Sequence, residues 1–417
     1  MKKIIGVLTA SLLTLGLFAC SNKEKEFKPL FDASKEYNIS VVGHYENFEA
    51  IEDEFVRFNK YYPKAKLTYT YLNNYNKIIS TALNSESAPD IFFTFPWMIN
   101  DSSYSELFTF TEDFSKKPGD IDLSVIREGL ISKKNDEIPM LPIYVTTYGM
   151  MVNEDLFKKE EINIPKTYNE LVDLCQKFKD KGYENVMMGH SSLIMYPMYF
   201  PHVCYKIKDN QSAINDLNEL KPEAGMYLRD SLNLVSNFMN KGFINLDNCS
   251  QLKNDYDAVI KRFFQGDVPM MLASGQTVSG TEKREKQSEN FTNNPFKYSL
   301  KPIPSLSDGG IFLNSVNLCF SVNKKSENLD ITNEFMRFLI SNEELGNMSK
   351  IKRLMTPAKD MSLDNIYASF SDAKPIYISN LGLNDTADRK IRNVGSKVAQ
   401  GKITVDDAIN NWATLLR

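Results

Sequence analysis

Aromatic and short polar side chains recur at the ends of several segments that have the composition of β-strands. Aromatic rings stack on the C–H faces of sugars, and hydroxyl, amide and carboxylate groups hydrogen-bond to sugar hydroxyls. Because open α/β sheets bind ligands at the carboxyl ends of their strands, residues in these positions are candidates for one shared site. The candidates are His44, Tyr45, Glu46, Phe95, Trp97, Tyr144, Thr146, Ser274, Gln276 and Asn314.

Several of these candidates also have an ordinary structural explanation. Trp97 has the alternative of packing in a core, but a Pro-Trp loop directly after an apolar strand is a poor place to bury a large ring. Glu46 has the alternative of a solvated loop charge, and His44 that of a hydrogen-bonded structural histidine. Trp97 is therefore the residue whose position most favours contact with a ligand.

The composition argues against several other kinds of chemistry. The 417-residue chain has a formal net charge of −4, whereas a protein that binds nucleic acid or anionic membrane needs concentrated positive charge. Its 3 histidines, without an HExxH sequence or paired CxxC motifs, do not predict a zinc centre. No motif selects the two carboxylates of a glycoside hydrolase. We therefore expect no cofactor, no metal and no enzymatic activity.

The elements that would position the candidates alternate between strand and helix. Residues 39–43 form a short apolar run, and the phenylalanine-rich stretch at 48–58 has the spacing of an amphipathic helix. Residues 66–72 then alternate apolar and polar side chains, as a strand does. A helix at 75–84 and a buried strand at 91–94 continue the pattern. This order predicts βαβ units and hence an α/β fold.

The rest of the chain continues this mixture, and its length exceeds the roughly 250 to 300 residues at which single cores stop growing, so we expect at least two lobes. Extended segments at 138–145 and 149–152 contain prolines, which indicates a sheet edge or a crossing between lobes. Thr167 and Glu170 form a capping box that starts a helix. Further strands are predicted at 268–273, 297–303 and 316–322, and further helices at 222–241, 329–340 and 404–416.

The N-terminus has the features of an export signal. Lys2 and Lys3 precede an apolar stretch at 4–19 that is shorter than the about 20 residues of a comfortable membrane span. The stretch ends in Leu-Phe-Ala-Cys20, which resembles the lipobox of bacterial lipoproteins, where the cysteine is diacylated and becomes the first mature residue. An ordinary signal peptide with a chance cysteine is the alternative. Residues 20–36 are predicted to be a lipidated, solvated tether.

Four further cysteines give no disulfide framework, because their spacings are wide. Cys175 and Cys319 lie in apolar patterns that predict burial. A bridge between Cys204 and Cys249 stays open in an exported protein.

Six short motifs follow one another along the mature chain. They are a Phe-rich helix that ends in Tyr62-Pro63, Ala88-Pro89-Asp90 before a strand, PIYVTTYGMMVNEDL at 142–156, IPKTYNEL at 164–171, FQGDVPMM at 264–271 and LISNEE at 339–344. Together they resemble the extracellular solute-binding proteins of ABC importers, in particular the sugar-binding type to which maltose-binding protein belongs.

The resemblance implies a periplasmic-binding-protein fold, in which two lobes, each a mainly parallel sheet flanked by helices, are joined by hinge crossings. After a signal peptide at 1–19 and the tether at 20–36, the first lobe would comprise residues 37–143 and 303–342, and the second 144–302 and 343–417. The expected partners are a sugar or oligosaccharide, the permease subunits of an ABC transporter, and the membrane through Cys20. The chain is expected to be an extracytoplasmic monomer.

The resemblance says less about the identity of the ligand than it says about the fold. Thr146-Thr147 and Gln276 stand where the maltodextrin pattern has Glu-Ala and Trp, so maltose itself is not expected. A sugar is favoured because the candidate side chains are mostly neutral. A peptide, polyamine or anion in the same fold remains an alternative, as does a glycan-processing surface enzyme.

Overall fold

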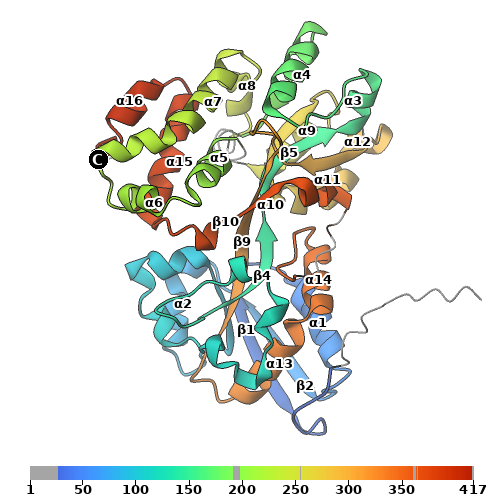
Figure 1. Cartoon of the computed structure of the whole chain (residues 1–417). Helices are drawn as coiled ribbons and strands as arrows, with labels where there is room; N and C mark the ends of the chain where they lie inside the picture. The colour runs from blue at the N-terminus through green and yellow to red at the C-terminus, as the bar shows by residue number, and fades with distance from the viewer. Residues whose placement is uncertain (1–26, 191–197, 254, 360–362, 364, 416–417) are drawn as a thin grey trace, which may run out of the picture.

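Two α/β lobes, each built around its own sheet, make up the chain (Figure 1). The computed structural model describes residues 27–190, 198–253, 255–359, 363 and 365–415, so the signal peptide and Cys20 lie outside the described residues. The first sheet contains β1 (Tyr37–Gly43), β2 (Ala65–Tyr71), β3 (Ile91–Thr94), β4 (Leu141–Thr146), β9 (Ile311–Val322) and β10 (Lys374–Tyr377). The second contains β5 (Tyr148–Asn153), β6 (Met187–Met188), β7 (Met270–Ser274) and β8 (Tyr298–Lys301). The predicted two-lobed α/β fold is confirmed.

Both sheets mix parallel and antiparallel pairs. In the first sheet the order is β10-β9-β3-β1-β2, and β4 also pairs with β9. β1 is parallel to β2 and to β3, whereas β9 runs antiparallel to β3 and β4. In the second sheet β5 is antiparallel to β7 and β8, and among its described pairs only β6 and β7 are parallel, so the expectation of a mainly parallel sheet is wrong for this lobe. The carboxyl ends of β1, β2 and β3 therefore meet at one edge of the first sheet.

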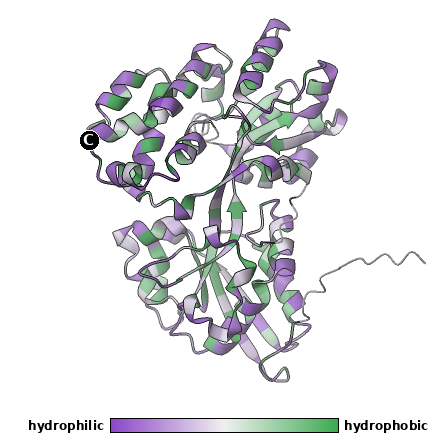
Figure 2. Ribbon diagram, viewed as in Figure 1, coloured by the Kyte–Doolittle hydropathy of each residue, from purple (hydrophilic) through white to green (hydrophobic). Residues whose placement is uncertain are grey.

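Hydrophobic periodicity accounts for the helices that cover the sheets (Figure 2). In α1 (Glu49–Phe58), Ile51, Phe55 and Phe58 are buried, as their spacing predicts. The capping box at Thr167 is present and starts α4 (Tyr168–Asp180). The other helices are α2 (Tyr75–Leu83), α3 (Glu154–Lys159), α5 (Tyr199–Ile207), α6 (Gln211–Asn218), α7 (Arg229–Asn240), α8 (Leu246–Ser250), α9 (Tyr256–Phe263), α10 (Gly275–Ser279), α11 (Thr281–Gln287), α12 (Glu289–Asn293), α13 (Leu329–Leu339), α14 (Asn342–Ile351), α15 (Asp385–Ala399) and α16 (Val405–Asn410).

The C-terminal helix and the cysteines both contribute to the core. α16 ends at Asn410, so the helix predicted at 404–416 is shorter, although Trp412 is fully buried. The four cysteines of the described residues are buried and free, and Cys204 and Cys249 do not pair.

None of the described helices is long and apolar enough to cross a membrane.

The end of the predicted tether packs on the first lobe instead of staying solvated. The Phe27 ring meets those of Tyr61 and Phe338 edge-on, at centroid distances of 4.9 and 5.3 Å. The Arg337 guanidinium lies 4.2 Å from the centroid of the same ring. The backbone N–H of Leu30 donates to Glu334 Oε1 at 3.0 Å. Phe27 therefore fixes this stretch to the first lobe, which its polar composition did not indicate. The tether ends no later than residue 26.

The contacts of α14 place it with the first lobe, beyond the boundary predicted at residue 342. Arg57 Nε on α1 donates to Glu344 Oε2 on α14 at 2.9 Å. Farther on, the N–H of Met355 donates to the carbonyl oxygen of Val145 at 3.0 Å. After Met355 the chain packs on the second lobe at residues 365–372, which contact β8, and again where α15 and α16 pack on α7.

Glu54 of α1 makes the stability of this helix pair dependent on pH. Glu54 is fully buried and paired with Arg57, and burial followed by hydrogen bonding with Glu344 raises its pKa from 4.5 to about 9. The folded state therefore holds this proton more tightly than the unfolded state, and the stabilisation is complete below pH 4.5 and lost as pH rises toward 9. Glu54→Gln should flatten the fall in unfolding free energy over that interval, measured by urea titration at several pH values. The exposed Glu52→Gln should behave as wild type, and an unchanged slope in Glu54→Gln would contradict the assignment.

Candidate functional site

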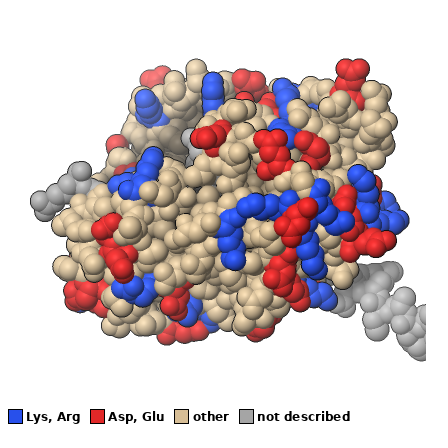
Figure 3. Space-filling view, turned by 90° about the horizontal axis from the view of Figure 1, so that it is seen from above, with Lys and Arg blue, Asp and Glu red and all other residues tan. Residues whose placement is uncertain are grey.

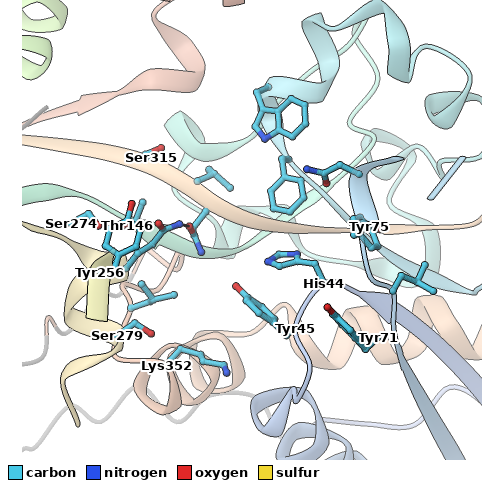
Figure 4. Close-up of a pocket in the computed structure, with 18 of the residues that line it drawn as sticks. His44, Tyr45, Tyr71, Tyr75, Thr146, Tyr256, Ser274, Ser279, Ser315 and Lys352 are labelled. Atoms are coloured by element: carbon cyan, nitrogen blue, oxygen red, sulfur yellow. Dashed lines mark hydrogen bonds between the residues drawn. The ribbon is translucent and has the colours of Figure 1, made fainter. Parts of the chain in front are cut away.

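A cavity of about 880 Å³ lies between the two lobes (Figure 4). One wall comes from the carboxyl ends of β1, β2 and β3, and the opposite wall from β5, α9 and α10. The middle of β9 and the end of β4 form the floor between them. The volume falls within the roughly 300 to 1,000 Å³ typical of small-molecule sites.

Most of the residues predicted from the sequence line this cavity. They are His44, Tyr45, Phe95, Trp97, Thr146, Ser274 and Gln276.

Three predicted residues do not line it. Glu46 is exposed in the loop after β1, where its charge is solvated. Tyr144 is fully buried, because register shifts on either side of it break the alternation of β4 and turn its ring toward Phe48, 6.4 Å away. Asn314 is also buried, and its side-chain amide donates to the carbonyl oxygen of Phe312 at 3.2 Å.

The wall of the first lobe is aromatic. Trp97 lies in the 3-10 turn Pro96–Asn100, directly after β3, and is 43% exposed. Its ring stacks on Phe95 with centroids 6.0 Å apart and an interplanar angle of 13°, and Tyr104 meets it edge-on at 5.3 Å. Two neighbours thus hold the indole in a fixed orientation while much of it stays accessible. Such a ring is a ready platform for a flat apolar face.

His44 extends this aromatic wall as a neutral group. Its ring centroid lies 4.3 Å from that of Tyr45 and 5.6 Å from that of Phe95. Burial lowers the pKa of His44, so the imidazole is uncharged at neutral pH.

A chain of polar contacts crosses the floor of the cavity. Gln276 Nε2 of α10 donates to Asn317 Oδ1 of β9 at 2.7 Å. Burial raises the pKa of Tyr45 to about 12, against a smaller lowering by the Asn317 side chain, and this keeps the Tyr45 hydroxyl protonated. Asn317 therefore connects a side chain of the first lobe with one of the second.

The start of α10 presses closely against β4. Ser274 caps the helix by accepting from the N–H of Thr277 at 3.4 Å, so its hydroxyl is already engaged. A Cβ atom at Gly275 would lie 2.5 Å from Thr146 Oγ1, which explains a glycine at this position. The Thr146 hydroxyl itself is buried and has no hydrogen-bond partner among the described residues. A ligand or water at the floor would satisfy it.

The comparisons with known proteins point to the same fold. Residues 55–375 match the family described as bacterial extracellular solute-binding protein. The chain belongs to this family. That assignment confirms the resemblance seen in the sequence motifs.

Solved structures of solute-binding proteins share the fold of this one over most of its length. The sugar-binding protein MalE from Xanthomonas citri superimposes with a TM-score of 0.70 and 16% identity, over 90% of this chain and 95% of MalE. The apo form of RafE from Streptococcus pneumoniae gives 0.68 and 15%, over 91% and 97%. A Bacillus licheniformis sugar transporter in complex with stachyose gives 0.62 and 15%, over 90% and 98%.

A curated relative is similar over a shorter stretch. The multiple sugar-binding protein of Streptococcus mutans is 23% identical over 184 residues, which are 43% of this chain and 42% of that protein. The match thus spans less than half the length of either protein.

The cleft of this solute-binding protein also contains residues that the sequence analysis missed. Tyr71, Tyr75 and Lys77 follow β2, and the rule that pointed to the ends of β1 and β3 would have found them if applied to β2 as well. Tyr256 and Ser279 reach the cavity from α9 and α10. Lys352 follows α14, and no local pattern marks it. Among the described residues, no group of three or more His, Cys, Asp and Glu could hold a metal ion.

The exposure of Trp97 separates its two possible roles. Because 43% of the residue is exposed, Trp97→Ala should change the thermal midpoint little, whereas a core Trp would cost about 3 to 5 kcal/mol of stability. Loss of the platform should weaken ligand affinity by about 1 to 3 kcal/mol, or roughly tenfold to over a hundredfold. Calorimetry with the ligand that copurifies with the protein measures this, and Trp97→Phe should retain most of the affinity. A large fall in midpoint with unchanged affinity would assign Trp97 to packing.

Proposed function

We propose that this chain is an extracytoplasmic receptor that captures a sugar or oligosaccharide between its lobes and delivers it to the permease of an ABC importer. The observation that carries the proposal is the cavity between the lobes, which is lined by aromatic rings, most of them from the first lobe, together with hydroxyl and amide groups from both lobes. Sugar rings present apolar C–H faces and hydroxyl edges, and the aromatic and polar side chains of the cavity match these two surfaces.

The comparisons support a sugar as the ligand class. The relatives named above include a multiple sugar-binding protein, a sugar-binding protein and a transporter protein with stachyose bound. Membership of an extracellular solute-binding family supports a location outside the cytoplasm.

The contents of the cavity favour binding over hydrolysis. A glycoside hydrolase ordinarily needs two carboxyl groups beside the scissile bond. Within the described part of the chain, neither Asp nor Glu lines the cavity. A polyamine would want carboxylates there for the same electrostatic reason.

Transport requires that the permease distinguish loaded from empty protein. A ligand that contacts both walls favours the arrangement in which the walls are closer, and this bias is the only signal needed. The chain passes between the two sheets at Thr147, between β4 and β5, and again at 302–310, between β8 and β9. We place the hinge at these two segments.

Ligand capture and closure can be tested together. Mass spectrometry of protein purified without denaturation should detect a copurified glycan. Adding that glycan to stripped protein should reduce the radius of gyration in small-angle scattering, with the far-ultraviolet circular dichroism unchanged. Recovery of a peptide or polyamine would overturn the sugar assignment, and an unchanged scattering profile at saturation would overturn the hinge.

Membrane attachment is proposed through Cys20, which follows the apolar segment at 4–19. Two acyl chains suffice for stable anchoring, whereas one gives only marginal binding. Cys20→Ala should therefore release the protein from the membrane fraction and remove the mass of the lipid. Cys175→Ala, which changes a buried free cysteine, is the matched control and should stay with the membrane. If Cys20→Ala fractionates as wild type does, the anchor is elsewhere.

A further inference from the structure

The charged side chains of the cavity are all of one sign. Among the described residues that line it, Lys77 and Lys352 are the only ones that carry a formal charge at neutral pH, because His44 is neutral. The protein as a whole has a net charge of −4, and positive and negative side chains are interspersed on the outer face seen in Figure 3. The positive lining is therefore a local property of the cleft.

Lys352 is the better defined of the two cations. Its ammonium lies 5.2 Å from the ring centroid of Tyr45 and 5.9 Å from that of Phe48, and Figure 4 shows it beside Tyr45 on the wall of the cavity. The side chain is partly buried, and burial lowers its pKa more than the charge of Glu49 raises it. Within the described residues it forms neither an ion pair nor a hydrogen bond, only these contacts with aromatic rings.

Three partly buried arginines, two in the first lobe and one next to Lys352, have carboxylate partners, whereas Arg127 donates to the carbonyl oxygen of Thr356. Arg57 pairs with Glu344 at 2.9 Å, Arg337 with Glu334 at 2.8 Å, and Arg353, the immediate neighbour of Lys352, with Glu285 at 3.3 Å. Removing a charge from water is unfavourable unless a counter-charge accompanies it. The Lys352 ammonium has no carboxylate partner among the described residues, so an anionic group of a ligand could pair with it.

The backbone fixes this lysine in position. It is the C-cap of α14, and Arg353 follows in the left-handed conformation with φ of 48°. The N–H of Leu354 then donates to the carbonyl oxygen of Ser349 at 2.9 Å, and Met355 pairs with Val145 of β4. Lys352 thus projects from the C-terminus of α14, and backbone hydrogen bonds just after it join the chain to β4 at the floor of the cavity.

We propose that the ligand is an acidic oligosaccharide, whose carboxylate or sulfate group is bound by Lys352 while its neutral rings contact the aromatic wall. The inference rests on the proposed sugar-binding function and narrows it to one chemical class. Lys77 lies at the same cavity on the exposed start of α2 and adds to the positive field.

A cation at a helix C-terminus also interacts favourably with the helix dipole, which would make Lys352 a stabilising residue only. The two roles differ in what they affect. A purely stabilising lysine would lower the thermal midpoint when removed and would leave ligand preference unchanged. A ligand-binding lysine would change the preference between acidic and neutral ligands.

The experiment compares matched acidic and neutral glycans. Isothermal titration calorimetry would use oligogalacturonates against galactose oligomers and oligoglucuronates against glucose oligomers of equal length and linkage. Sulfated against unsulfated galactose oligomers and inorganic sulfate alone complete the panel. The proteins are wild type, Lys352→Gln, and Lys350→Gln, an exposed lysine of the same helix that does not line the cavity.

Wild type should bind the acidic member of at least one pair more tightly than its neutral partner. Lys352→Gln should reduce that affinity by about ten- to hundredfold, the range of a charge-assisted hydrogen bond, with little change for the neutral glycan and no fall in thermal midpoint. Lys350→Gln should match wild type.

The other outcomes separate this inference from the proposed function. Equal or tighter binding of the neutral glycans, unaffected by Lys352→Gln, overturns the acidic ligand and leaves sugar binding intact. Binding of inorganic sulfate as tightly as of any sulfated glycan shows a simple anion site and also overturns it. If no glycan binds, the proposed sugar-binding function fails and the inference fails with it.

Discussion

The pairing of β9 with its neighbours is the constraint on which the rest of the structure depends. This strand of 12 residues pairs with β3 and β4 on antiparallel registers and with β10 on a parallel one. The ring of Phe320 stacks on that of Phe93 at 5.4 Å, and Ser321 hydrogen-bonds to Thr94 at 2.8 Å. Because the middle of the same strand forms the floor of the cavity, the core of the first lobe and the geometry of the site cannot vary independently.

The two lobes contribute different sets of side chains to the cavity. The first lobe presents rings that are held by other rings, which keeps an apolar face accessible without leaving it mobile. The second lobe presents hydroxyl and amide groups from α10, whose first turn packs closely against β4, together with the rings of Tyr148 and Tyr256. Exposed aromatic surface and a buried Thr146 hydroxyl without a hydrogen-bond partner are both unfavourable. A ligand that covers the rings and hydrogen-bonds to this hydroxyl would remove both costs.

Local sequence patterns predicted the alternation of strands and helices and much of the cavity lining, because the periodicity of these elements is visible in short windows. The two-lobed binding-protein fold was predicted from the family motifs. Trp97 and His44 were found because each directly follows a strand. Tyr144 was assigned to the cleft wrongly because register shifts, which depend on the partner strand, decide where its side chain points. Lys352 could not be found at all, since a helix end reaches the cleft only through its pairing with β4. The boundary at 342 failed for the same reason, as contacts between α1 and α14 leave no mark in either segment alone.

The docking of Phe27 on the first lobe has a mechanical consequence. The lipid attachment proposed at Cys20 would leave only residues 21–26 between the membrane and Phe27, which is fixed among Tyr61, Phe338 and Arg337. A chain segment extends at most about 3.3 to 3.6 Å per residue, so such an anchor would keep Phe27 within about 25 Å of the bilayer surface. On that proposal the first lobe would be the part held at the membrane, and the second lobe would be the part that moves when a ligand binds.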